Sequence, residues 1–262
     1  MKPYIPIIVV TLIGVGAFIV LSNTTSYDSG ATQTSATPFN TSIPTFTLPQ
    51  KVQPTKTQTP TKTIPLSTLP SSIILKDVQF ASQAPLRNWD LPFQDFCEEA
   101  SSLIAAFYAL GKKVPSPEGI STELLRIKDF EDKNIGHYED TTALETTRIL
   151  KEFYGLTDVT LIQNPTIDDI KMQLAQEKVI MVPSAGRMLG NPYFHAPGPL
   201  YHMLVIKGYT PSGYFITEDP GTNTKGENYT YKFATIMNAI HDWNGDDMEH
   251  GAKVVISVGK QK

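Results

Sequence analysis

The chain has 262 residues, a net charge of −4 and 40% hydrophobic residues, which suits one folded domain with additional segments. This charge balance argues against a nucleic-acid-binding protein that relies on a basic face. The single cysteine, Cys97, excludes an internal disulfide and a zinc site built from several cysteines. No motif in the sequence indicates a metal or a cofactor.

Residues 1–22 are predicted to form an N-terminal membrane anchor. Residues 5–21 are almost wholly apolar, Lys2 precedes them, and no acidic residue occurs before Asp28. At about 1.5 Å per helical residue, this stretch is just long enough to cross a bilayer core. No A-x-A site follows, which favours an uncleaved single-pass anchor over a cleaved signal peptide, whose removal would give a secreted protein. The cation on the short side predicts that the remainder of the chain is extracytoplasmic.

Two segments of different composition follow the predicted anchor. Residues 23–72 are dominated by Thr, Ser and Pro and are predicted to form a disordered, extended linker. Residues 73–262 are predicted to fold, and they carry 18 Lys and Arg against 25 Asp and Glu, a net charge of −7. An acidic domain beyond a spacer favours small or peptidic substrates over anionic polymers.

The apolar periodicity of residues 73–262 predicts an α+β fold in which helices precede most of the strands. Strands are expected at 73–80, 159–162, 179–182, 201–207, 213–217 and 253–258. Helices are expected at 97–111, 121–130, 141–154, 166–176 and 231–243. The loop at 184–200 is rich in Gly and Pro, and we expect it either to wall a cleft or to act as an ordinary connection.

Cys97 is the candidate nucleophile. Asp95 is expected to cap a helix, with Glu98 completing a capping box, which places the thiol in the first helical turn. The positive end of the helix dipole favours a thiolate there, whereas the adjacent carboxylates of Glu98 and Glu99 oppose it. A small buried cysteine on a helix is the alternative reading.

His202 and Asp219 are the candidate base and its orienting acid. In a simple hairpin centred near Thr210 and Pro211, His202 and Asp219 would be direct cross-strand neighbours on one face. The carboxylate would then fix the orientation and tautomer of the imidazole. His195 is the strongest rival as the base, but it lacks an acidic partner at hairpin distance.

Acyl transfer also needs donors for the oxyanion that forms on the carbonyl group. The main-chain N–H of Cys97 is one candidate, and a side-chain amide from the preceding loop is a second. Gln83 and Gln94 both qualify by residue type, and the residues alone do not separate them.

The motifs FASQAP, CEEAS at a helix start, YHMLVIKGY and EDPGT together resemble a papain-like cysteine peptidase. More narrowly, residues 78–258 are similar to the bacteriocin-processing, double-glycine-leader peptidases, the C-39-like type. The resemblance implies a helical half that bears the cysteine and packs on an antiparallel sheet bearing histidine and aspartate. It also implies that Gln83 helps to bind the oxyanion and that the substrate is a peptide or protein. The small residue that usually follows the cysteine is replaced here by Glu98.

Two other activities remain open on sequence grounds. The same Cys-His-Asp order is found in transglutaminase-like acyltransferases, which pass the acyl group to an amine. A catalytically inactive peptide-binding module would retain the fold, and the acidic pair after the cysteine favours it. Asp242, Asn244 and Asp246 have the alternate spacing of a calcium loop, but its central Gly and closing Glu are missing, so a solvated loop is expected.

Overall fold

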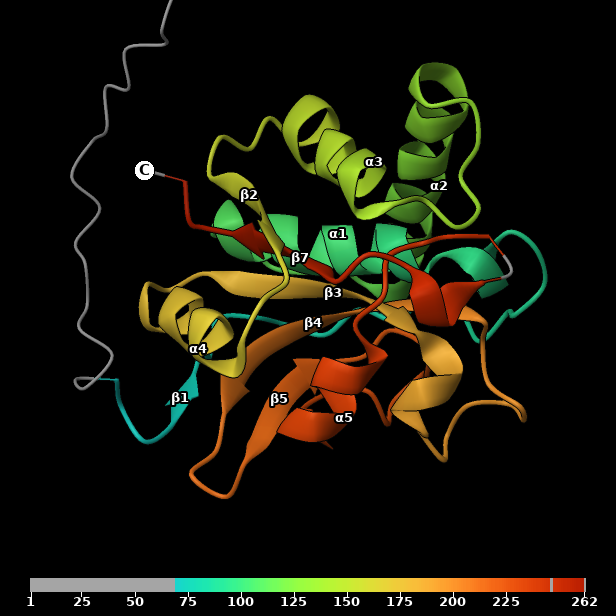
Figure 1. Ribbon diagram of the computed structural model, residues 1–262. Helices are drawn as coiled ribbons and strands as arrows, with labels where there is room; N and C mark the ends of the chain where they lie inside the picture. The colour runs from blue at the N-terminus through green and yellow to red at the C-terminus, as the bar shows by residue number, and fades with distance from the viewer. Residues whose placement is uncertain (1–68, 246, 262) are drawn as a thin grey trace, which may run out of the picture. The chain divides into compact units, whose positions relative to one another are not determined.

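The computed structural model describes residues 69–245 and 247–261, which form an α+β fold (Figure 1). Its main elements are β1 (Ile73–Ile74), α1 (Cys97–Ala109), α2 (Pro117–Asn134), α3 (Ala143–Arg148), β2 (Val159–Gln163), α4 (Ile167–Ala175), β3 (Val179–Ala185), β4 (Tyr201–Tyr209), β5 (Tyr214–Glu218), β6 (Tyr229–Lys232), α5 (Phe233–Ala239) and β7 (Val254–Val258). No helix among these residues is long and apolar enough to span a bilayer. The predicted anchor and residues 23–68 of the predicted linker lie outside the described residues.

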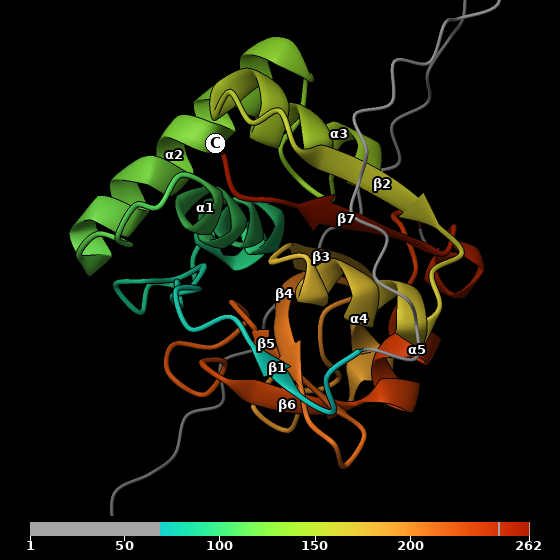
Figure 2. The same ribbon diagram turned by 90° about the vertical axis from the view of Figure 1, so that its left-hand side faces the viewer.

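The strands form one antiparallel sheet of order β2-β7-β3-β4-β5-β6, and the short β1 pairs with β4. Helices α1, α2 and α3 lie on one side of the sheet, while α4 and α5 lie on the other (Figures 1 and 2). The sheet is therefore covered on both faces, which explains why its central strands are mostly apolar rather than alternating between apolar and polar residues.

The central strands β3 and β4 are buried at every residue, and their alternate side chains enter two separate cores. Met203 and Val205 join the core beneath α1 and α2, whereas Leu204 and Ile206 join the core beneath α4 and α5. This is the two-residue period of a strand. Full burial of such a side chain contributes about 1.5–3 kcal/mol, so the two cores together fix the strand's orientation.

Several predicted boundaries differ from the structure. The strand expected at 73–80 is limited to Ile73–Ile74. The helix expected at 121–130 begins at Pro117, after Ser116 as its cap, and it continues to Asn134. The helix expected at 231–243 is wrong in its first part, because residues 229–232 instead form β6 against β5. Strand β6 adds one more strand to the sheet beside β5. The helix that follows, α5, is therefore shorter than predicted and begins only at Phe233.

A bulge at Lys207 in β4 decides which side chains share a face with His202. Tyr209 faces Phe215, but beyond the bulge Ile206 faces Thr217, so the register shifts by one residue. Such a shift moves every later side chain to the opposite face. At His202, the register predicted from the turn is wrong by two residues. An error of two residues leaves His202 and Asp219 on the same face of the sheet, but Asp219, just after β5, is a diagonal rather than a direct neighbour of His202.

Candidate active site

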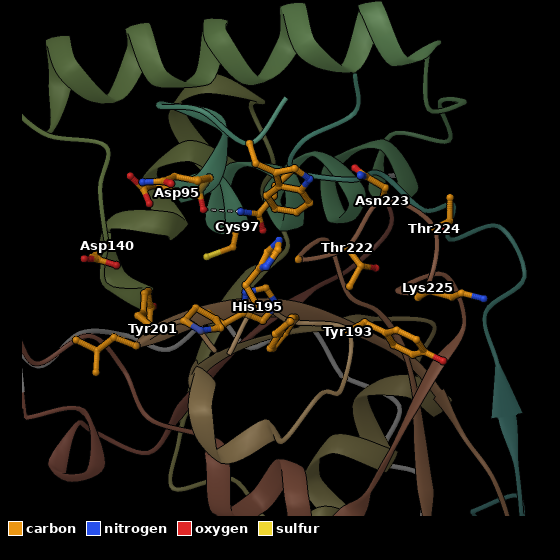
Figure 3. Close-up of a pocket in the computed structure, with 18 residues that line it drawn as sticks. Asp95, Cys97, Asp140, Tyr193, His195, Tyr201, Thr222, Asn223, Thr224 and Lys225 are labelled. Atoms are coloured by element: carbon orange, nitrogen blue, oxygen red, sulfur yellow. Dashed lines mark hydrogen bonds between the residues drawn. The ribbon is translucent and has the colours of Figure 1, made fainter. Parts of the chain in front are cut away.

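A cavity of about 630 Å³ lies at the start of α1, between that helix and the beginning of β4 (Figure 3). Its wall includes Cys97 from the helix, His202 from the strand and Gln83 from the preceding loop. The loop at 184–200 contributes a further wall through residues such as Phe194 and His195. The structure therefore brings the predicted nucleophile, base and amide to one concave surface, the usual setting for a ligand.

Cys97 is the first residue of α1, as its sequence context predicted, but the predicted cap is wrong. Phe96 occupies the N-cap position and makes no side-chain hydrogen bond, while Asp95 ends a short 3₁₀ helix at Phe93–Asp95. The carboxylate of Asp95 is therefore not used to cap the helix. Because the 3₁₀ helix leads directly into α1, Asp95 is not at the N-cap position, and its side chain lines the cavity instead.

The Cys97 thiol makes its hydrogen bond to a carboxyl group. Its Sγ donates to Oε2 of Glu98 at 2.8 Å. Burial raises the pKa of the Cys97 thiol well above its usual range, and the charges of Glu98 and Glu99 raise it further. The main chain of Met203, which follows His202, acts in the opposite direction. The resting thiol is therefore protonated, and the helix start alone does not make it acidic.

The His202 side chain is held by a buried carboxylate. Its Nε2 lies 2.8 Å from Oδ1 of Asp219, which also accepts from the Gly221 N–H at 3.0 Å. The other oxygen accepts from the Tyr231 hydroxyl at 2.6 Å and from the Asn191 amide at 3.0 Å. Burial by itself would raise the pKa of Asp219, but the imidazole and these donors outweigh it and hold the pKa below its usual value.

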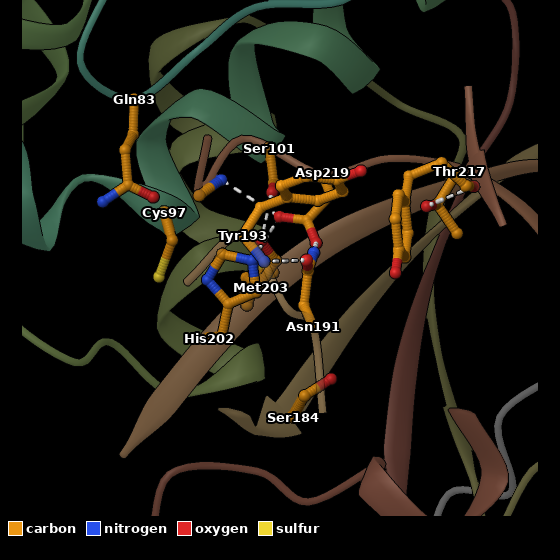
Figure 4. Close-up of polar contacts among 12 residues, drawn as sticks. Gln83, Cys97, Ser101, Ser184, Asn191, Tyr193, His202, Met203, Thr217 and Asp219 are labelled. Atoms are coloured by element: carbon orange, nitrogen blue, oxygen red, sulfur yellow. Dashed lines mark hydrogen bonds and ion pairs between the residues drawn. The ribbon is translucent and has the colours of Figure 1, made fainter. Parts of the chain in front are cut away.

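This network gives the imidazole a defined orientation. With Nε2 donating to Asp219, Nδ1 is the nitrogen left to accept a proton. Figure 4 shows the ring of His202 between the sulfur of Cys97 and the carboxylate of Asp219. Phe194 packs edge-on against the ring, with centroids 5.0 Å apart. The contact with Asp219 that the hairpin predicted is thus present, although its register differs.

Gln83 is buried in the cavity wall, and its amide is already partly engaged. Nε2 donates to the carbonyl oxygens of Gln94 at 2.7 Å and Phe93 at 3.3 Å. Its main-chain N–H donates to the carbonyl of Pro220, which ties this loop to the turn after Asp219. Oε1 is buried and has no hydrogen-bond partner among the described residues. Gln94 also lines the cavity, so both predicted amides lie there.

Three carboxyl groups are buried together behind Cys97. Glu98 and Glu99 come from α1 and Glu131 comes from α2, and all three are almost fully buried. Burial raises the pKa of Glu98 to about 8 and that of Glu131 to about 9, each with a neighbouring acidic charge adding to the effect. Burial and the charge of Glu131 raise the pKa of Glu99 well above its usual range. These groups are therefore largely protonated at neutral pH.

Replacing Glu98 by glutamine is expected to make the thiol more acidic. The change removes the negative charge that Glu98 acquires above its pKa of about 8 and leaves a neutral amide oxygen as the acceptor, so the pKa of the thiol falls. Above the pKa of Glu98 and below that of the thiol, each unit of that fall raises the thiolate population about tenfold. The measurement is the rate of Cys97 alkylation by iodoacetamide between pH 6 and 10. Glu118→Gln, at the exposed start of α2, is the matched control and should leave this profile unchanged. An unchanged profile in Glu98→Gln would contradict the assigned role.

Sequence reasoning missed Asn191 and Tyr231, the two side chains that hold the far oxygen of Asp219. The Asn191 amide also donates to the Tyr231 hydroxyl at 2.8 Å, which closes the network. Tyr231 was expected in a helix, and Asn191 lies in the long loop. The Y-T-Y alternation at 229–231 and the N-P pair at 191–192 were the available signals, but neither indicates a partner distant in the sequence.

The rival histidine and the calcium-like spacing, both considered in the sequence, have different surroundings from the site around Cys97. His195 lines the same cavity, but no acidic side chain among the described residues is hydrogen-bonded to it. Asp242, the first residue of the calcium-like spacing, accepts from the main-chain N–H groups of Ala143 at 2.7 Å and Trp243 at 3.0 Å. Its carboxylate therefore supports the start of α3. Asp246 lies outside the described residues.

A thiol at a helix start, with an imidazole and a buried carboxylate at the same cavity, is an arrangement typical of the cysteine-peptidase class. Comparison with known proteins agrees with this class, because the sequence model of the Peptidase_C39 like family matches residues 75–247. The chain belongs to this family, which confirms the resemblance inferred from its motifs. Comparison with curated proteins found no match. Among solved structures, a protein from Bacillus anthracis described as a C39-like peptidase is similar, with a TM-score of 0.49 and 13% identity over 73% of this chain and 98% of that one.

Proposed function

We propose that this protein is a membrane-anchored, extracytoplasmic cysteine peptidase. Cys97 is the nucleophile, His202 the general base and acid, and Asp219 the group that orients the imidazole. One observation carries the proposal: the imidazole lies between the thiol and a buried carboxylate, with Nε2 2.8 Å from Oδ1 of Asp219, at the wall of a cavity. Membership of the C39-like family supports the same reaction class.

In the proposed reaction, Sγ of Cys97 attacks the carbonyl carbon of the scissile bond while its proton passes to Nδ1 of His202. The oxyanion collapses to a thioester, and the same proton goes to the leaving amine. Water then attacks the thioester, with the imidazole first taking and then returning a proton to the sulfur. Asp219 stabilises the imidazolium at each stage without itself becoming protonated.

The oxyanion is proposed to be bound by the N–H of Cys97 and the amide of Gln83. The first N–H groups of a helix have no acceptor within it, so that of Cys97 is available. The amide of Gln83 would contribute by exchanging its longer hydrogen bond, the 3.3 Å contact to Phe93, for the oxyanion. The thiol must likewise exchange its hydrogen bond to Glu98 for one to His202 before it reacts.

The membrane attachment is proposed from residues 1–72 alone. An apolar stretch preceded by Lys2 and followed by a Thr, Ser and Pro linker would hold the folded domain away from the outer surface of the membrane. In this arrangement the enzyme acts on peptides or proteins near that surface. Fractionation of cells producing the full chain tests it: the protein should stay with the membranes after a carbonate wash, and external protease should remove the domain.

Hydrolysis is tested by incubating the full chain with a mixture of peptides in water enriched in ¹⁸O. A peptidase introduces ¹⁸O into each new carboxyl terminus, which mass spectrometry detects. Cys97→Ala is the control for contaminating activity. If an added primary amine is instead joined to the acyl fragment, the protein is an acyltransferase rather than a peptidase. If the wild type cleaves none of the peptides at any pH tested, the catalytic proposal is overturned.

A catalytically inactive peptide-binding module is the second candidate, because one specific observation favours it. The thiol donates to Glu98 and its pKa is raised, which is the opposite of an activated nucleophile. This alternative predicts peptide binding that survives Cys97→Ala and no ¹⁸O incorporation in the wild type. Both candidates therefore predict peptide binding, and only the peptidase predicts ¹⁸O incorporation.

A further inference from the structure

One side of the active-site cavity is formed by a segment with a single buried side chain. This wall segment, residues 190–200, contributes Tyr193, Phe194 and His195 to the cavity lining. Within it only Asn191 is buried, with 6% of its surface exposed, and Asn191 does not itself line the cavity. The segment is therefore attached to the interior of the domain by a polar side chain rather than by an apolar one.

The carboxamide of Asn191 contacts the orienting carboxylate on one side and the wall segment on the other. Its Nδ2 donates to Oδ2 of Asp219 at 3.0 Å and to the Tyr231 hydroxyl at 2.8 Å. Its Oδ1 accepts from the main-chain N–H of Tyr193 at 3.0 Å. Because an ionised carboxylate can only accept, Asp219 determines which side of the amide faces it. The side chain thus connects the wall segment to Asp219 in one orientation (Figure 4).

A second contact joins the wall segment to the imidazole. The main-chain N–H of Phe194 donates to the carbonyl oxygen of Asn191 at 3.2 Å, which closes a turn whose aromatic ring packs edge-on against His202. Gly221 makes room for this packing, because a Cβ there would lie 2.7 Å from the Phe194 ring and 2.8 Å from Cε1 of His202. The wall segment therefore contacts both members of the acid–base pair.

The remaining contacts of the wall segment are at its end or on the surface. The carbonyl oxygen of Leu200 accepts a main-chain hydrogen bond just before β4 begins. Arg187 donates to the carbonyl oxygen of Gly198 at 3.4 Å in an exposed contact. The ring of Tyr193 is 51% exposed and lies 6.2 Å from that of Tyr229. A buried hydrogen bond to a carboxylate is stronger than these contacts, so Asn191 dominates the attachment of the middle of the segment.

We propose that Asn191 is a positioning residue that couples the wall segment to Asp219, so that the substrate-binding wall and the acid–base pair are ordered together. The proposal rests on the peptide-cleaving function inferred above and adds a residue that contacts neither the substrate nor the thiol. Because such a coupling is reciprocal, a change at Asp219 should loosen the wall, just as a change at Asn191 should disturb Asp219.

Two measurements on the full chain test the coupling without turnover. Hydrogen exchange with mass spectrometry follows the amides of Tyr193 and Phe194, and NMR of ¹⁵N-histidine-labelled protein follows the Nε2 proton that His202 donates to Asp219. In Asn191→Ala, exchange should be about tenfold faster, because a buried hydrogen bond to a charged group is lost. The imidazole proton signal should move downfield, because a carboxylate that loses a donor becomes more basic and strengthens its remaining hydrogen bonds.

Three further variants separate coupling from general loosening. Asp219→Asn leaves residue 191 unchanged and should also accelerate exchange in the wall segment. Tyr231→Phe removes another donor to the same oxygen of Asp219 and should move the imidazole signal more than it changes exchange in the wall. Arg187→Gln is the matched control, because it weakens an exposed contact of the wall segment, and it should leave the imidazole signal in place.

Faster exchange with an unchanged imidazole signal in Asn191→Ala would reduce Asn191 to a loop anchor and overturn the coupling. A moved signal with unchanged exchange, or an equal movement in Arg187→Gln, would overturn it as well. If Asn191→Ala does not fold, unchanged exchange in Asp219→Asn overturns the proposal.

Kinetics with a cleaved peptide add a readout that a purely structural role would not produce. Asn191→Ala should lower kcat by about tenfold or more and also raise KM, because the imidazole and the wall are both displaced. Tyr231→Phe should affect kcat more than KM. An unchanged KM in Asn191→Ala would contradict the role of the wall. Coupling seen by exchange and NMR together with no ¹⁸O incorporation would retain this inference and reject the peptidase function.

Discussion

Alanine in place of His202 is expected to lower kcat for peptide hydrolysis by about 10³-fold or more. The resting thiol has a raised pKa because it is buried beside carboxyl groups, so almost no thiolate exists at neutral pH without a base. Asp219→Asn should produce a comparable loss, because the amide no longer fixes the imidazole tautomer. The measurement is kcat and KM across pH 5 to 9 with a cleaved peptide.

His195→Ala is the matched control for that prediction. Its imidazole lines the same cavity but has no acidic partner among the residues that the structure describes, so its removal should lower kcat no more than about tenfold. Tyr231→Phe tests the network more gently: it removes the 2.6 Å hydrogen bond to Asp219 and should change the pH profile of kcat more than KM. A larger loss from His195→Ala than from His202→Ala would assign the base to the other histidine.

Conformational stability is expected to fall as the pH rises from about 4.5 to 8. Folding raises the pKa values of Glu98, Glu99 and Glu131 above their usual value of 4.5, so the folded state retains protons that the unfolded state releases. Stability is therefore greatest below pH 4.5 for these groups and decreases through this window. Each such carboxyl contributes at most about 1.4 kcal/mol per pH unit to the slope. Urea unfolding at a series of pH values measures it.

Glu131→Gln should make this slope shallower and stabilise the domain at pH 8 by about 1–3 kcal/mol, since the amide needs no proton to remain neutral. Asp129→Asn is the matched control, because that carboxylate lies on the exposed face of the same helix. In this variant, the free energy of unfolding should change with pH as it does in the wild type. A stability that rises between pH 5 and 8 in the wild type would mean that the buried carboxyl groups have found partners and remain ionised.

The buried carboxyl groups and the thiol form one electrostatic unit. Glu98 contacts the sulfur directly, and burial together with the charge of Asp140, which lines the cavity, raises the pKa of Glu98. A cation bound beside Asp140 would offset the negative charge of Asp140 and so lower the pKa of Glu98. Substrate charge and thiol chemistry are thereby linked through three neighbouring groups.

The local features of the site followed from the sequence. The apolar face of 97–111 and the strands that begin near 179 and 201 were predicted because their periodicity repeats over short distances. The helix predicted at 166–176 is present as α4, and Thr166 and Asp169 form the reciprocal hydrogen bonds of a capping box at its start. Cys97 at a helix start and a contact between His202 and Asp219 belong to the same group of predictions.

Only the tertiary structure decided how these elements are registered and what surrounds the thiol. The face shared by His202 and Asp219 depends on a bulge at Lys207, whose buried ammonium group pairs with Glu218. The hydrogen bonds of Asn191 to Asp219 and Tyr231 join residues that are 28 and 40 positions apart. Residue type and local spacing fix helices, strands and candidate chemistry, whereas register, burial and long-range pairing depend on the packing of the whole domain.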